Sequence, residues 1–194
     1  MIKLGITGGI GSGKSTVSEI FSLCGIPVYI ADVESKRITS SSLIVREQLV
    51  NIFGDVLFAN GVLNKSLLAS YIFNDPTNLK KVNGIIHPEV KKDFCEWVNK
   101  NYKYNIVAQE AAILYESGFD KLMDKVVMVY TPLEMRLERT MRRDNISREK
   151  VLERIRNQMP DEEKAELSDY VIVNDGTESL IEQVLTVIQQ LKSI

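Results

Sequence analysis

The sequence is poor in the residues that build soft-metal and redox centres. Its 194 residues contain two cysteines and one histidine. Cys24 and Cys95 lie far apart and without CxxC spacing, which argues against a zinc site and against a disulfide framework. Both cysteines fall in helix-like segments, and we predict that they are buried thiols in a reducing compartment.

Long apolar runs and a strong net charge are also missing. The opening apolar run is too short for the core of a signal peptide, and no stretch approaches the ~20 apolar residues of a membrane span. We therefore expect a soluble, cytoplasmic protein without a membrane partner. The formal net charge of −2 lacks the basic field of nucleic-acid binders and favours a small-molecule partner. The oligomeric state stays open.

What the chain does contain is an alternation of short β-branched runs with amphipathic stretches. With 44% apolar residues it can bury the core of one main domain. The alternation predicts βα units and therefore an α/β fold, with a five-stranded parallel sheet and helices on both faces. The expected strands are residues 3–7, 27–30, 104–109, 125–130 and 170–173.

The stretch between the second and third expected strands is too long for a simple crossover. Residues 32–100 read as consecutive helices without a convincing strand. We expect breaks in this stretch at Phe53-Gly54, Asn60-Gly61, Asp75-Pro76 and His87-Pro88. The sequence therefore predicts an inserted helical subdomain within a single domain that spans residues 1–194.

Other helices are predicted from apolar spacing and from signals at their ends. The first covers residues 14 to about 24 and stops at a glycine. Residues 131–134, Thr-Pro-Leu-Glu, form a capping box in which Thr131 is the N-cap of a helix that reaches about Arg143. Further helices are expected at residues 149–159 and 178–192.

A glycine-rich motif follows the first expected strand. Residues 8–16, Gly-Gly-Ile-Gly-Ser-Gly-Lys-Ser-Thr, fit the P-loop pattern GxxxxGK[ST] between a strand and a helix. Glycines let backbone amides point at phosphate oxygens, and the helix N-terminus adds the positive end of its dipole. Lys14 would reach the β- and γ-phosphates, and Ser15 would offer its hydroxyl to Mg²⁺. A mere tight turn explains the motif less well, so the sequence predicts nucleotide binding.

A P-loop alone does not separate a kinase from a GTPase switch or a mechanical ATPase. Guanine-specific GTPases use an NKxD element and a DxxG switch. Neither Asn64-Lys65 nor Asn99-Lys100 is followed by the required Asp, and no Asp has a Gly three residues on. These patterns disfavour a GTPase.

Asp32 is a candidate for contact with a phosphoryl acceptor. It follows the second expected strand, so in a doubly wound sheet it would lie at the carboxyl edge near the P-loop. A carboxylate there can orient an acceptor hydroxyl and take its proton. From the residues alone, a plain N-cap for the helix that begins at Val33 explains Asp32 equally well.

The helix after the fourth expected strand carries four arginines. Helical spacing places Arg136, Arg139 and Arg143 on one side, where they could stabilise the charge of a transferring phosphoryl group. Arg142 follows Glu138 by four residues and is explained by a surface ion pair. For the whole cluster, a solvated helix face is an equal alternative.

Taken together, these residues resemble dephospho-CoA kinases, P-loop kinases of the nucleoside and nucleotide kinase group. The resemblance extends from Leu4 to Gly176. The matching positions are residues 5–16, Asp32, Phe53-Gly54, Asn60-Gly61-Val62-Leu63, His87-Pro88, Arg139, Arg143-Asp144, Arg154, Gln158, Lys164 and residues 169–174 (Asp-Tyr-Val-Ile-Val-Asn).

The resemblance implies transfer of the ATP γ-phosphate to the 3′-hydroxyl of 3′-dephospho-CoA, with Mg²⁺, giving CoA and ADP. It also implies a division of the chain into a substrate-binding insertion at residues 32–100, a closing lid at residues 131–160, and a core formed by residues 1–31, 101–130 and 161–194. A lid that excludes water would prevent wasteful hydrolysis of ATP.

The motif and the resemblance together assign the site residues. Lys14, Asp32 and Arg139 are expected to be catalytic, and Ser15 to bind the metal. The expected ATP contacts are Gly9, Gly11, Ser12, Gly13, Lys14, Ser15, Thr16, Arg139, Arg143, Asn174 and Gly176, the last two beside adenine.

The chain departs from the family pattern in places. Ile30-Ala31-Asp32 stands where Asp-Ala-Asp is usual, and Asn64-Lys65 where Asp-Arg is common. Residues 110–116, Glu-Ala-Ala-Ile-Leu-Tyr-Glu, replace the usual Pro-Leu-Leu-Phe-Glu. These differences weaken the substrate contacts more than the ATP site. Glu110 is either a partner of Mg²⁺ through water or a loop carboxylate, and His87 is left out of the chemistry.

Two other functions remain open from the residues. Another nucleoside or nucleotide kinase of the same architecture would share the P-loop, Asp32 and the arginines but accept a different hydroxyl or phosphate. A nucleotide-dependent binding switch would bind ATP without transferring phosphate to a small acceptor.

Overall fold

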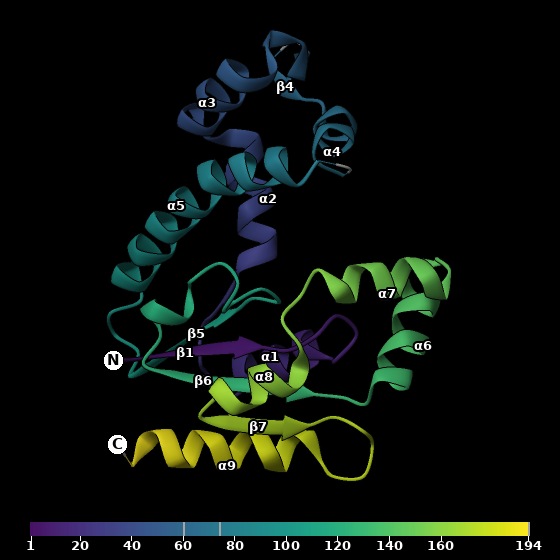
Figure 1. The fold of residues 1–194 in the computed structure, drawn as a ribbon. Helices are drawn as coiled ribbons and strands as arrows, with labels where there is room; N and C mark the ends of the chain where they lie inside the picture. The colour runs from purple at the N-terminus through teal and green to yellow at the C-terminus, as the bar shows by residue number, and fades with distance from the viewer. Residues whose placement is uncertain (60, 74, 194) are drawn as a thin grey trace. The chain divides into compact units, whose positions relative to one another are not determined.

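The structure is a computed structural model that describes residues 1–59, 61–73 and 75–193 (Figure 1). The chain divides into two compact units. Met1–Ile30 and Asn101–Ile194 form the first, which we call the sheet unit, and Ala31–Lys100 form the second, which we call the helical unit. Among the described residues, no helix has the length and apolarity that a membrane span requires.

A parallel sheet forms the centre of the sheet unit. Its strand order is β2-β5-β1-β6-β7, and every neighbouring pair is parallel. This confirms the α/β fold and the five-stranded parallel sheet predicted from the sequence, for the part of the chain that is described. The strands are β1 (Ile2–Thr7), β2 (Val28–Ile30), β5 (Ile106–Glu110), β6 (Lys125–Tyr130) and β7 (Tyr170–Val173).

Helices cover both faces of this sheet. Val17 and Phe21 of α1 and Val184 of α9 pack on one face, against strand residues such as Leu4 and Val127. Gly5 lies between Leu4 and Ile6 in β1, so a side chain at this position would point to the opposite face of the sheet. On that face α8 contacts β6. The helices of the sheet unit are α1 (Lys14–Leu23), η2 (Asp120–Leu122), α6 (Leu133–Asp144), α7 (Arg148–Arg156), α8 (Asp161–Leu167) and α9 (Leu180–Lys192).

The helical unit is organised around its longest helix, α5, which packs against α2, α3 and α4 (Figure 1). The buried residues of α5 recur at helical spacing and are Val82, Ile85, Ile86, Val90 and Phe94. The elements of this unit are α2 (Ala31–Ser41), α3 (Leu43–Phe53), η1 (Asp55–Leu57), β3 (Phe58–Ala59), β4 (Val62–Leu63), α4 (Lys65–Phe73) and α5 (Pro76–Lys100).

Two predictions for the helical unit are wrong. First, the stretch contains an antiparallel hairpin, β3–β4, where no strand was expected. The predicted break at Asn60-Gly61 includes Asn60, which lies outside the described residues; Gly61, with φ 80°, directly precedes β4. Second, His87-Pro88 does not interrupt α5. Buried Ile86 and Val90 on either side of Pro88 anchor the helix in one core, which offsets the hydrogen bond that proline cannot make.

Some helix ends of the sheet unit also differ from the prediction. Thr131 does not cap α6, because the helix begins at Leu133 and the cap position belongs to Pro132. The helix expected to reach residue 159 ends at Arg156, and α8, which follows it, was not predicted. The last helix begins later than expected, with Ser179 as its N-cap.

The prediction of buried cysteines is wrong as well. Cys24 and Cys95 are both free and exposed. Cys24 follows the last residue of α1 and so leaves its buried stripe. Cys95 comes directly after buried Phe94, and a one-residue step along a helix rotates the side chain away from the core.

Candidate active site

The P-loop connects the carboxyl end of β1 to the first turn of α1. Gly13 is the N-cap of α1 and adopts the left-handed region, with φ 88° and ψ 23°. A Cβ atom at this position would overlap the side-chain amide of Asn174. Glycine is therefore required here for its backbone conformation and for the close approach of a neighbour.

Lys14 folds back across the loop. Its side chain is largely buried, and Nζ donates a hydrogen bond to the carbonyl of Gly9 at 3.3 Å. The backbone amide of Ser12 donates to the same carbonyl at 3.1 Å. The loop thus closes on itself, with the ammonium group held over it.

Ser15 lies in the first turn of α1 and reaches the end of β5. Its Oγ donates a hydrogen bond to Glu110 Oε1 at 3.4 Å. Glu110 is the last residue of β5 and pairs in register with Ile6 of β1. Hydroxyl and carboxylate oxygens are donors that Mg²⁺ accepts, and Mg²⁺ commonly uses few protein ligands together with substrate phosphates. The donor set therefore fits this ion, although the described residues hold no cluster of three or more His, Cys, Asp or Glu able to bind a metal by themselves.

The carbonyl of Ser12 is held from outside the loop by two side chains. Asn174 Nδ2 donates to it at 2.8 Å, and the Thr131 hydroxyl donates to it at 2.9 Å. The Thr131 hydroxyl also lies 3.0 Å from the carbonyl of Asn174. The sequence pattern assigned Thr131 to a helix cap, and the family resemblance placed Asn174 beside adenine, so neither revealed this contact.

The arginines of α6 point to different surroundings. Arg136 is 6% exposed and its Nη2 lies 2.9 Å from Asp161 Oδ2 at the start of α8. Its guanidinium packs so closely on Gly9 that a Cβ there would overlap it. Arg139 Nη1 donates to the Thr131 hydroxyl at 3.5 Å, and exposed Arg143 pairs with Asp144. Arg136 and Arg139 therefore lie at the P-loop, whereas Arg143 is engaged by its neighbour.

The segment after α7 makes a contact with the P-loop that the sequence did not predict. Gln158 Oε1 accepts a hydrogen bond from the backbone amide of Ile10 at 3.0 Å. The next residues are fixed by Glu116, which accepts from the Met159 amide at 2.7 Å and lies 3.0 Å from Lys164 Nζ. The match of Gln158 and Lys164 to the family pattern was the only signal in the sequence for this contact.

Asp161 and Lys164 form a buried charged group behind the loop. Lys164 is fully buried and also donates to the carbonyl of Ala112 at 2.7 Å. Burial raises the pKa of the Asp161 carboxyl, and the positive charges of Arg136 and Lys164 act in the opposite direction. The pairing with Arg136 compensates the charge that burial would otherwise disfavour.

The remaining predicted site residues occupy several places. Gly11 has φ 80° and contacts the backbone of α6, and Thr16 is exposed in the first turn of α1. Gly176 has φ 88° in the exposed segment that follows Asn174. Asp32 is the second residue of α2, is exposed, and belongs to the helical unit.

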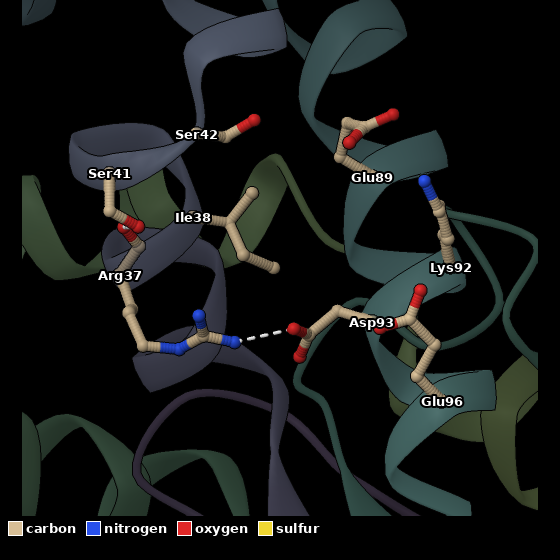
Figure 2. Close-up of a pocket in the computed structure, with 8 residues that line it drawn as sticks. All are labelled: Arg37, Ile38, Ser41, Ser42, Glu89, Lys92, Asp93 and Glu96. Carbon is tan, nitrogen blue, oxygen red and sulfur yellow. Dashed lines mark hydrogen bonds and ion pairs between the residues drawn. The ribbon is translucent and has the colours of Figure 1, made fainter. Parts of the chain in front are cut away.

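The helical unit has a groove of its own between α2 and α5 (Figure 2). Arg37 Nη2 lies 2.6 Å from Asp93 Oδ1 across it, and this contact together with Glu34 raises the pKa of Arg37. Two cationic and three carboxylate side chains line the groove, so its charge does not favour a phosphate-rich ligand. The lining residues are Arg37, Ile38, Ser41, Ser42, Glu89, Lys92, Asp93 and Glu96.

Comparison with known proteins places the chain in a family. The family model CoaE, dephospho-CoA kinase, matches residues 2–179. A dephospho-CoA kinase of Bacteroides fragilis is 51% identical over 187 residues, which cover 96% of this chain and 91% of that protein. A solved structure from Thermus thermophilus is 35% identical, with a TM-score of 0.86 over 97% of this chain and 96% of that one.

A second solved structure carries the family name in its description. It is a dephospho-CoA kinase from Campylobacter jejuni, 27% identical, with a TM-score of 0.73 over 98% of this chain and 97% of that one. These comparisons confirm the resemblance seen in the sequence motifs. The P-loop is in place, the family model covers residues 2–179, and the relatives that match nearly the whole chain share one name. The chain therefore belongs to the dephospho-CoA kinase family of ATP-dependent phosphotransferases.

Proposed function

We propose that this protein transfers the γ-phosphoryl group of ATP to the 3′-hydroxyl of 3′-dephospho-CoA, giving CoA and ADP, the last step of coenzyme A biosynthesis. The observation that carries the proposal is an intact P-loop, with Lys14 folded across it, in a chain that matches the family over residues 2–179. We place the reaction in the cytoplasm, with two small-molecule substrates and with neither a nucleic acid nor a membrane as partner.

Positioning and charge compensation supply most of the rate in such a transfer. The P-loop amides and Lys14 would hold the β- and γ-phosphates, and Arg139 from α6 would stabilise the charge spread over the moving phosphoryl group. Asp32, two residues beyond the end of β2, would orient the acceptor hydroxyl and accept its proton. Without the usual acidic neighbour at position 30, Asp32 would act alone.

The Ser15 hydroxyl would bind Mg²⁺, with Glu110 as a partner through water. The ion would neutralise part of the charge on the β- and γ-oxygens. The contact between Ser15 Oγ and Glu110 Oε1 supports this assignment, because it brings two hard oxygen donors together beside the P-loop.

Each of the two units would bind one of the two substrates. Asn174 and Gly176 would lie beside adenine in the sheet unit, with Arg143 as a further ATP contact, and residues 32–100 would hold the CoA precursor. Residues 131–160 would act as a lid. The hydrogen bond from Ile10 to Gln158 supports the lid assignment, because it links the end of that segment to the P-loop.

A coupled assay of ADP release tests the proposal. We expect turnover with dephospho-CoA and little with adenosine, shikimate or nucleoside monophosphates. Lys14→Ala should lower the turnover by about 100-fold or more, because it removes the cation that holds the transferring group. Comparable turnover on a nucleoside monophosphate, with none on dephospho-CoA, would identify a different kinase. ATP binding without transfer to any of these acceptors would identify a switch.

A further inference from the structure

Three strand ends meet at the carbonyl of Ser12. Ser12 lies in the loop after β1, Thr131 follows the last residue of β6, and Asn174 follows the last residue of β7. The Asn174 amide and the Thr131 hydroxyl donate to this carbonyl at 2.8 Å and 2.9 Å. The carbonyl thus receives two donors from elements far away in the sequence.

Because the Ser12–Gly13 peptide is planar and trans, these contacts also determine the direction of the Gly13 N–H. In such a peptide the carbonyl oxygen of one residue and the N–H of the next point in opposite directions. Because the Ser12 carbonyl points to Thr131 and Asn174, the Gly13 N–H points to the opposite side of the peptide, away from these two side chains. The Gly13 carbonyl is fixed as well, since it accepts the α1 hydrogen bond from Val17 at 3.2 Å.

We propose that Thr131 and Asn174 are positioning residues for phosphoryl transfer, which hold the Ser12–Gly13 peptide so that the Gly13 amide faces the nucleotide phosphates. This inference rests on the proposed ATP-dependent function. Asn174 would still lie beside adenine, but this role does not require its side chain to recognise the base, and Thr131 gains a role in place of the helix cap that its sequence context suggested.

The hydroxyl of Thr131 has a second effect on the same site. It accepts a hydrogen bond from Arg139 Nη1 at 3.5 Å while its own proton is directed to the backbone carbonyls of Ser12 and Asn174. Thr131 is fully buried, so water does not replace these contacts. One hydroxyl therefore orients both a P-loop peptide and an arginine of α6.

The first test replaces the hydroxyl at nearly constant volume. Thr131→Val should raise the Kd of ATP and of ADP about 10-fold, since a buried hydrogen bond of this kind controls roughly that factor. The turnover number at saturating substrates should change less than the KM for ATP. Thr131→Ser, which keeps the hydroxyl, should bind ATP within about 2-fold of the unchanged protein.

Thr39→Val is the matched control. Thr39 is also a buried threonine, and its hydroxyl donates to the carbonyl of Ser35 within α2 of the helical unit at 2.6 Å. The same chemical change there should leave the Kd of ATP unaltered. If Thr131→Val bound ATP as tightly as the unchanged protein, or if Thr39→Val weakened binding equally, the positioning role would be wrong.

The second test separates the positioning role from a contact with adenine. Asn174→Leu keeps the approximate shape of the side chain and removes the amide donor without adding a charge that would itself repel the phosphates. We expect the Kd of ATP and of inosine triphosphate to rise by the same factor, about 10-fold or more. A loss confined to ATP would show that Asn174 reads the base, and it would overturn our proposal.

These measurements stay decisive under other outcomes. Asn174 is only partly buried, so Asn174→Leu carries the test even if Thr131→Val is not recovered in folded form. Nucleotide binding is measured by calorimetry without an acceptor. A failure to phosphorylate dephospho-CoA would therefore contradict the proposed substrate and would leave the positioning role to be judged by the affinities alone.

Discussion

Asp32 is the residue whose chemical role can be tested most directly. It is exposed at the second position of α2, and a carboxylate that takes a proton late in transfer contributes roughly 100- to 10,000-fold to the rate. We predict that Asp32→Asn lowers the turnover number by about 100-fold or more and changes the Kd of ATP by less than about 2-fold. Steady-state turnover and calorimetry measure the two quantities.

Asp55→Asn serves as its control, because Asp55 is another exposed carboxylate of the helical unit. It should leave both quantities unchanged. Near-normal turnover in Asp32→Asn would remove Asp32 from the chemistry and leave the alternative of a simple helix-end residue.

At the residue scale, the sequence was informative where the chemistry is local. The P-loop was predictable from the sequence, because its amides, Lys14 and Ser15 are neighbours in the chain. The contacts that hold this loop could not be read, since the residues that make them are separated by 119 positions for Thr131, 148 for Gln158 and 162 for Asn174. Only the fold brings such residues together.

At the scale of elements, α5 carries an exposed glycine in its interior. A Cβ added to Gly84 would meet nothing within 4 Å, and the φ of Gly84 is outside the left-handed region. Glycine in a helix interior costs about 0.5–1 kcal/mol relative to alanine. We therefore predict that Gly84→Ala raises the free energy of unfolding by that amount, measured by urea denaturation.

Gly54 provides a control of opposite sign in the same unit. It lies at the C-terminal cap of α3, and a Cβ there would also meet nothing within 4 Å. Its φ of 82° and ψ of 167° are conformations that only glycine adopts readily. Gly54→Ala should therefore destabilise the protein although no atom is in its way. Equal effects of the two substitutions would show that backbone conformation does not decide their sign.

The elements themselves were predictable to different degrees. The strands of the sheet were found because they are β-branched runs buried on both faces, as Val126–Val129 of β6 illustrates. The hairpin β3–β4 was missed because each of its strands has two residues, too few for an alternating pattern. The cap at Thr131 was misassigned because its hydroxyl bonds to the P-loop instead, a tertiary contact that overrides the local signal.

At the scale of the whole molecule, the chain is two compact units joined by two crossings, at residues 30–31 and 100–101. If ATP binds the sheet unit and dephospho-CoA binds the helical unit, each ligand should protect a different set of amides from hydrogen exchange. A ligand present at 100 times its Kd stabilises the species that binds it by about 2.7 kcal/mol. Amides that exchange only through unfolding of that unit should then exchange about 100-fold more slowly.

We predict that ATP alone slows exchange in β1, α1 and β6, whereas dephospho-CoA alone slows exchange in α2 and α5. Hydrogen-exchange mass spectrometry resolves these segments. Lys14→Ala should lose the protection by ATP and keep the protection by dephospho-CoA, because it alters only the P-loop. Equal protection of both units by ATP alone would mean that they unfold as one cooperative body, since two independently opening units cannot both gain stability from a ligand held by one of them.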